Sequence, residues 1–130
     1  MEEIDIKNLD KEKFKIQVLS APEGLKVIIA GSIEINNAED LIVNYFEYLH
    51  NAILARRLQK IELDITKLLF INSTGISALV KWFSLLPQLP PEQFYKIEII
   101  YNVNVIWQKN SLYVLKKIAE NNLHLVEIKL

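Results

Sequence analysis

The sequence has 130 residues, which is the size of one domain and long enough to bury a real core. Hydrophobic residues make up 51%, charged residues 24%, and the formal net charge is -1, so the chain is typical of an ordinary globular protein and has no basic block for nucleic acid. The absence of cysteine excludes disulfides, cysteine-ligated zinc and thiol catalysis. A signal-peptide core and an apolar run of the ~20 residues that span a bilayer are both missing, so we expect a cytoplasmic protein without membrane contacts.

Residues 1–12 are interpreted as a polar lead-in and residues 13–130 as a single domain. Apolar and polar residues alternate with period two in segments 14–20, 25–31, 60–65, 95–100 and 124–130, as they do in strands. Because one set of side chains in each segment is largely polar, we expect helices mostly on one face of the sheet. In the last strand, the pattern assigns Val126 and Ile128 to the covered face.

Segments with helical periodicity separate the later strands at 38–57, 73–86 and 110–120. Pro87 ends the second, and Asn110 or Ser111 is the expected N-cap of the third. The short connection at 20–24 predicts a hairpin, whereas the strand–helix–strand units predict parallel crossovers. The result is a two-layer α/β domain with a small mixed sheet and the element order ββαβαβαβ.

Few side chains have the types and spacing that catalysis or cofactor binding requires. His50 and His124 have no acidic or serine partner at a recognisable spacing, so we expect both to be structural or exposed. Only three glycines occur, no glycine-rich phosphate loop is present, and no oxygen and nitrogen ligands cluster around a metal position. We therefore predict a protein without enzymatic activity, cofactor or metal.

Two residues near strand ends are site candidates with structural alternatives. Gly31 follows the second predicted strand, where a bulge or a turn with positive φ explains a glycine equally well. Asp64 closes the third predicted strand on its polar face. A carboxylate there lies at the rim where α/β folds place ligands, although a turn cap is just as compatible with it.

The stretch INSTGIS, residues 71–77, opens the second helix. Asn72 and Ser73 are preferred N-cap residues, which gives the hydroxyl a purely structural interpretation. Gly75 is unfavourable inside a helix unless some group must approach its backbone closely. The alternative is phosphorylation at Ser73, because the helix N-terminus favours negative charge.

Residues 61–83, IELDITKLLFINSTGISALVKWF, resemble the signature of the STAS domain family, which includes anti-sigma-factor antagonists and sulfate-transporter tails. In that family a strand ending in Asp leads through a loop to an Asp-Ser-Ser/Thr-Gly-Leu turn that opens a helix. The matching positions are Asp64 for the strand-end Asp, Ser73 for the phosphorylated Ser, Thr74, Gly75, Ile76 for the Leu, and Gly31 for the Gly of a Gly-Glu-Leu element. Asn72 replaces the usual Asp, which marks a branch with Asn-Ser-Thr-Gly.

The resemblance implies a bacterial, non-enzymatic regulator of transcription that acts by partner switching. A serine kinase similar to an anti-sigma factor would phosphorylate Ser73, with Thr74 as the alternative acceptor, and a PP2C-like phosphatase would reverse the modification. The unmodified form would bind the partner. Two alternatives stay open: a STAS-fold scaffold or ligand-sensing module without phosphorylation, and an enzyme that uses the rim around Asp64 and Ser73.

The second helix predicts a docking surface beside this motif. At 100° per residue, its inward face consists of Ile76, Leu79, Val80 and Phe83. Ala78, Trp82 and Leu85 then lie on the outward flank, where a Trp is a common interface anchor; the alternative is that Trp82 covers the edge of the core. The full set of predicted partner-binding residues is Gly31, Asp64, Asn72, Ser73, Thr74, Gly75, Ala78, Trp82 and Leu85.

Overall fold

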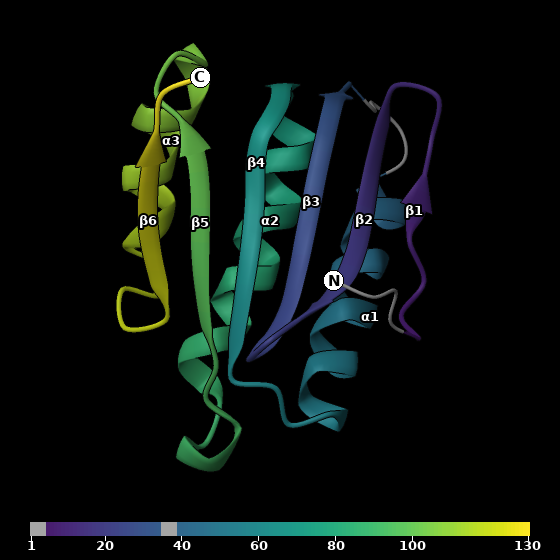
Figure 1. Ribbon diagram of the computed structural model, residues 1–130, viewed down its shortest axis with the longest axis vertical. Coiled ribbons are helices and arrows are strands. Elements are labelled where there is room, and N and C mark those ends of the chain that lie inside the picture. Colours follow the sequence, from purple (N-terminus) through teal and green to yellow (C-terminus); the bar gives the residue numbers. More distant parts are fainter. Residues whose placement is uncertain (1–4, 35–38) are drawn as a thin grey trace.

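The computed structural model describes residues 5–34 and 39–130, and these form one mixed sheet with helices on a single face (Figure 1). The strands lie in the order β1-β2-β3-β4-β5-β6. The elements are β1 Leu9–Asp10, β2 Phe14–Ala21, β3 Gly24–Ile33, α1 Glu39–Ala55, β4 Lys60–Ile71, α2 Ser73–Leu85, the 3₁₀ turns η1 Leu86–Gln88 and η2 Pro91–Gln93, β5 Lys96–Asn102, α3 Ile106–Lys116 and β6 Leu123–Ile128.

The predicted two-layer α/β architecture is confirmed. A two-residue turn joins β2 and β3 as an antiparallel hairpin, whereas β3, β4, β5 and β6 pair in parallel with one helix between successive strands. The inward side chains of the central strands alternate with outward polar ones, as the period-two pattern predicted. The opposite face of the sheet carries no helix among the described residues (Figure 1).

Residues 5–12, which the sequence pattern assigned to a polar lead-in, pack against the rest of the domain. Leu9 and Asp10 form the short strand β1 against β2, and Ile6 is buried. The hydroxyl of Tyr45 on α1 donates to the carbonyl of Lys7 at 2.7 Å, and the amide of Val18 donates to Oδ1 of Asn8 at 2.8 Å. A two-residue strand is too short for alternation to reveal, so the sequence pattern missed it.

Strand β4 is twice as long as predicted and divides into two halves. Its first half, Lys60–Asp64, pairs with both β3 and β5, but the second half pairs only with β3 and has two register shifts. On the other side, the start of α3 covers the unpaired edge. Nε2 of the buried Gln108 donates to the carbonyls of Ile65 and Leu68 at 2.6 and 3.0 Å.

Helix α3 starts earlier than predicted, and the side chains of β6 point to the opposite faces from those predicted. Helix α3 begins at Ile106, four residues early, so Asn110 and Ser111 lie inside it and neither caps it. In β6, Leu123 and Leu125 pair with the buried Ile97 and Ile99, so they share the helix-covered face. Val126 and Ile128 therefore lie on the open face, and their assignment to the covered face was wrong.

The core lies between the sheet and the three helices α1, α2 and α3. Phe46 on α1 stacks on Trp82 on α2 with ring centroids 4.9 Å apart. No helix in the described ranges is both long enough and apolar enough to cross a bilayer.

Candidate functional site

Ser73 is the first residue of α2 and its side chain is exposed. The N-cap is Asn72, which has extended backbone geometry and accepts a hydrogen bond on Oδ1 from the amide of Gly75 at 3.0 Å. The amide of Asn72 in turn donates to the carbonyl of Ile33 at 2.9 Å, which holds the cap against the end of β3. Because Asn72 performs the capping, the hydroxyl of Ser73 is not needed to start the helix.

Gly75 is explained by packing inside the protein. It is buried, and a Cβ at this position would lie 2.6 Å from Cγ1 of Ile71 and 2.9 Å from Cγ2 of Ile33. The groups that approach its backbone closely are therefore the side chains of Ile71 and Ile33 in the core under the helix, and packing explains the glycine. Thr74, between Ser73 and Gly75, is partly exposed.

Gly31 and Asp64 both shape the sheet. Gly31 lies inside β3 with φ 103°, and a Cβ there would meet the carbonyl oxygen of Lys13 at 2.2 Å. Asp64 lies in the middle of β4, and its Oδ1 accepts hydrogen bonds from the amide and the hydroxyl of Thr66 at 2.9 and 2.7 Å. This carboxylate supports the register shift that follows it. Gly31 thus has the positive φ, and Asp64 the local hydrogen bonds, that the structural alternatives predicted. The predicted position of Asp64 at the end of the strand was wrong, because β4 continues to Ile71.

The outward orientation predicted for α2 was wrong for two of its three residues. Ala78 and Trp82 are 0% and 1% exposed, whereas Leu85 keeps partial exposure. The helix packs against α1 as well as against the sheet, so it buries a wider arc than a single inward stripe, and Trp82 faces Phe46 on α1. Trp82 is therefore a core residue, with 1% of its surface exposed.

Large apolar side chains are exposed close to Ser73, and sequence reasoning did not select them. Leu69 is 65% exposed and Phe70 47% exposed at the end of β4, and Ile106 is 89% exposed at the start of α3. The indole of Trp107 donates to the carbonyl of Leu68 at 2.9 Å, which holds the start of α3 against this end of β4. The run LLF at 68–70, immediately before the motif, is the sequence signal for two of them.

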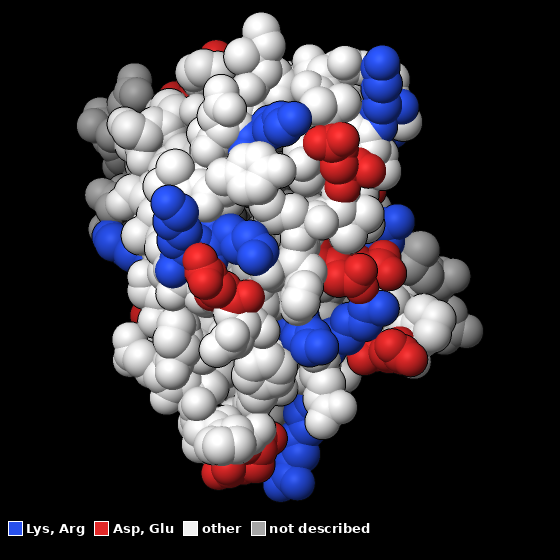
Figure 2. Space-filling view, turned by 90° about the vertical axis from the view of Figure 1, so that its left-hand side faces the viewer, with Lys and Arg blue, Asp and Glu red and all other residues white. Residues whose placement is uncertain are grey.

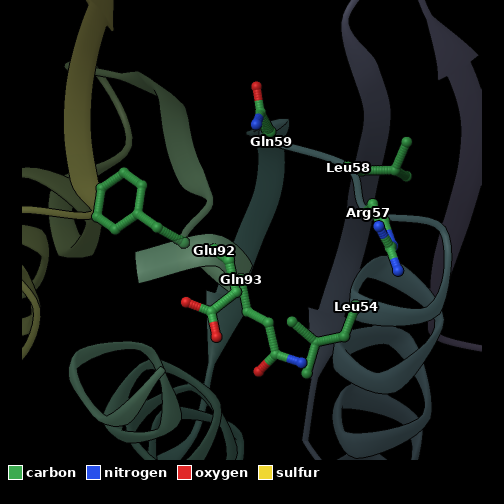
Figure 3. A pocket seen from close by; sticks show the side chains of 7 residues that line it. Leu54, Arg57, Leu58, Gln59, Glu92 and Gln93 are labelled. Carbon is green, nitrogen blue, oxygen red and sulfur yellow. The ribbon is translucent and has the colours of Figure 1, made fainter. Parts of the chain in front are cut away.

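The hollows of the surface do not coincide with Ser73. A hollow of about 170 Å³ is lined by Leu54, Arg57, Leu58, Gln59, Glu92, Gln93 and Phe94 (Figure 3). Leu58 and Gln59 precede β4, whereas Ser73 follows it, so the two sites lie at opposite ends of that strand. Within the described residues, no three His, Cys, Asp or Glu side chains gather into a possible metal site.

The side of the molecule that carries α3 and β6 has mixed charge. Figure 2 shows Lys and Arg side chains interspersed with Asp and Glu over this face, with broad uncharged areas between them. Lys109 lies 3.9 Å from Glu127, and Lys60 lies 2.8 Å from Glu98. This face therefore lacks the single-sign basic surface that nucleic-acid backbones select.

The arrangement is similar to that of a solved regulatory protein. The crystal structure of an anti-sigma factor antagonist from Mycobacterium paratuberculosis matches with a TM-score of 0.57 and 17% sequence identity, over 89% of this chain and 90% of that chain. The chain has a STAS-like fold. Comparisons of the sequence with protein-family models and with curated proteins find no match.

The STAS-like fold places the Asn-Ser-Thr-Gly turn where β4 ends and α2 begins. Of the residues predicted to form the site, Asn72, Ser73 and Thr74 lie together at this exposed turn, with Gly75 beneath them. Asp64, Ala78 and Trp82 belong to the sheet and the core.

Proposed function

We propose that this chain is a non-enzymatic regulator that binds a partner protein, and that phosphorylation at Ser73 switches the binding off. The observation that carries the proposal is the exposed hydroxyl at the first position of α2, beside a cap that Asn72 already supplies. Likeness to an anti-sigma factor antagonist supports a protein partner. We infer that the partner is a serine kinase similar to an anti-sigma factor, that a PP2C-like phosphatase reverses the modification, and that the switch regulates transcription in the bacterial cytoplasm.

A phosphate on Ser73 is compatible with the fold. The amide of Gly75 is bonded to Asn72, so the amides of Ser73 and Thr74 are the first-turn donors left for phosphate oxygens within the described chain. The helix dipole favours a negative group at this end, and the phosphate adds about -1.5 to -2 charge. Modification would change the surface while the helix stays in place.

The Asn72 side chain preserves the cap without adding charge. Asn and Asp are both strong N-cap residues, so the helix start is equally well supported with either. The amide lacks the carboxylate's repulsion for a neighbouring phosphate, which favours the phosphorylated state in this chain. A partner kinase for this chain would then recognise a neutral residue before the acceptor serine.

The proposal is tested on the protein as it occurs in its native cell. Mass spectrometry of the isolated chain is expected to find phosphate on Ser73, with Thr74 as the alternative position. Capture experiments with the wild-type chain are expected to retain an ATP-binding kinase, and Ser73→Glu is expected to lose it while Ser73→Ala retains it. Equal retention by Ser73→Glu and wild type, with an unchanged circular dichroism spectrum, would contradict the switch.

The second candidate function is ligand sensing or scaffolding without phosphorylation, and the hollow in Figure 3 is the observation that favours it. Figure 3 shows Leu54, Arg57 and Leu58 on one side of the hollow and Glu92 and Gln93 on the other. The hollow combines the apolar side chains of Leu54, Leu58 and Phe94 with polar and charged ones, and small-molecule sites likewise combine apolar contact with polar groups that fix the orientation of the ligand. This candidate predicts no phosphate on Ser73 in cells and a ligand-dependent rise in melting temperature that Arg57→Ala abolishes.

A further inference from the structure

The exposed apolar side chains Leu69, Phe70 and Ile106, which we call the edge patch, lie where β4 ends and α3 begins. Phe70 and Ser73 are three residues apart along the chain, so their Cα atoms are at most about 11 Å apart. Because Trp107 is bonded to the carbonyl of Leu68, Ile106 lies beside the end of β4. The edge patch therefore combines two elements that are distant in sequence.

The edge patch is exposed because β4 and β5 stop pairing after Asp64. Beyond Asp64, β4 has no strand partner on the β5 side, and the register shift near Leu69 turns consecutive side chains outward. Gln108 and Trp107 donate to the carbonyls of Ile65 and Leu68 on this edge, while Leu69 and Phe70 stay exposed. Exposed large apolar side chains that lie together are one mark of an interaction site.

Positive charge flanks the edge patch. Lys67 precedes Leu69 by two residues on β4, is exposed, and makes no ion pair with any described residue. Lys109 follows Ile106 by three residues and so lies on the same side of α3; its distance of 3.9 Å from the exposed Glu127 makes it a weak pair. Two carboxylates in this part of the chain already have partners: Glu34 forms an ion pair with Lys13 at 3.1 Å, and Asp64 accepts a hydrogen bond from Thr66.

We propose that the edge patch docks a partner protein whose contact surface combines apolar anchors with carboxylates. The partner is expected to carry carboxylates because lysines flank the edge patch. It is expected to carry apolar side chains because Leu69, Phe70 and Ile106 are apolar. The proposal rests on the proposed function. It explains why phosphorylation would weaken binding of the partner rather than strengthen it. Phosphate on Ser73 places negative charge at the border of the edge patch, and this charge repels an acidic partner.

Two designed peptides of about five helical turns serve as probes. Both carry the same Leu and Phe face, and the polar face is Glu in one and Lys in the other. Each is titrated into the ¹⁵N-labelled full chain. The Glu peptide is expected to shift the amides of residues 67–70 and 106–109 and to bind at least about tenfold more tightly than the Lys peptide, with an advantage that shrinks as salt is added.

Variants separate charge from apolar contact. Lys67→Glu is expected to reverse the order of the two peptides. Ile106→Ser is expected to weaken the Glu peptide at least about fivefold, as loss of an interface anchor does. The matched control is Val114→Ser, because Val114 is also on α3, is 66% exposed and lies outside the edge patch. The control is expected to bind like wild type.

Several outcomes overturn the proposal. Equal binding of the two peptides excludes charge complementarity, and amide shifts confined to other elements exclude the edge patch. Shifts of the edge-patch amides with protein concentration alone show that a second copy of the chain covers it.

Ser73→Glu distinguishes the two proposals from each other. If the Glu peptide binds the edge patch of wild type and Ser73→Glu equally, the docking surface stands and the switch fails. If neither peptide binds there although Ser73 carries phosphate in cells, the switch stands and the edge patch fails.

Discussion

The indole of Trp82 on α2 donates a hydrogen bond of 3.0 Å to the phenolic oxygen of Tyr95, immediately before β5. Nδ1 of His50 on α1 lies 2.7 Å from the same oxygen. An indole N–H can only donate, so the Tyr95 oxygen accepts from Trp82, and the tautomer of His50 sets which partner donates in the second contact. One buried oxygen thus joins two helices to the sheet.

Trp82→Ala is expected to lower the free energy of unfolding by about 3–5 kcal/mol, the usual cost of a cavity left by a large core side chain. The stack on Phe46 and the hydrogen bond to Tyr95 are both lost. Urea denaturation followed by circular dichroism measures the change. Tyr113→Ala is the control, because Tyr113 is 52% exposed and its loss is expected to cost less than about 0.5 kcal/mol. A Trp82→Ala protein as stable as wild type would contradict the core assignment.

The same network predicts a pH dependence of stability. Burial lowers the pKa of His50 below its ordinary value. In the unfolded chain this imidazole titrates near about 6.5, so below that pH the unfolded state binds the proton more readily than the native state does. Stability is therefore fully present above about pH 7 and is lost as the pH falls through the unfolded pKa, by at most about 1.4 kcal/mol per pH unit for one proton.

Urea denaturation at pH 7.5 and 5.5, compared with variants, measures the contribution of His50. His50→Gln is expected to flatten the pH dependence, whereas His124→Gln on the exposed side of β6 is expected to leave it unchanged. An unaltered slope in His50→Gln would show that other groups carry the acid sensitivity.

The sequence pattern predicted the central strands well because each buries one face. Period-two alternation in β2 and β5 matches their observed burial closely. It failed at β6, an edge strand, where Leu125, Val126 and Ile128 are all only partly buried and the two faces differ little. It also failed at the second half of β4, because register shifts interrupt the alternation on which the prediction depends.

The exposed turn at Ser73 could be found from residue types, but the surroundings could not. Asn72, Ser73 and Gly75 have strong local preferences that mark a helix start. Trp82 is buried because α1 packs against α2, and no local sequence pattern predicts that two helices pack together. The edge patch arises from contact between Trp107 and Leu68, which are 39 residues apart.

Gly75→Ala is expected to destabilise the protein although alanine favours helices by about 1 kcal/mol over glycine. The added methyl would lie 2.6 Å from Cγ1 of Ile71, and overpacking of this kind costs about 1–3 kcal/mol. The double variant with Ile71→Ala is the control, because the alanine at 75 should cost less once that side chain is shortened. Additive effects of the two substitutions would contradict direct contact.

Gln108→Leu tests how the bare edge of β4 is held. The substitution removes the donor to the carbonyls of Ile65 and Leu68 and the acceptor for the amide of Asn102, at 2.8 Å, all in a residue that is 0% exposed. Each orphaned buried group costs about 1–3 kcal/mol, so we expect a loss of at least about 2 kcal/mol and faster hydrogen exchange at the Asn102 amide. Asn110→Leu, exposed on the same helix, should change neither quantity. If Gln108→Leu matched wild type in both, the Ile65 carbonyl and the Asn102 amide would not depend on Gln108 for their pairing, which would contradict this account of the edge; the Leu68 carbonyl keeps the indole of Trp107 as a donor.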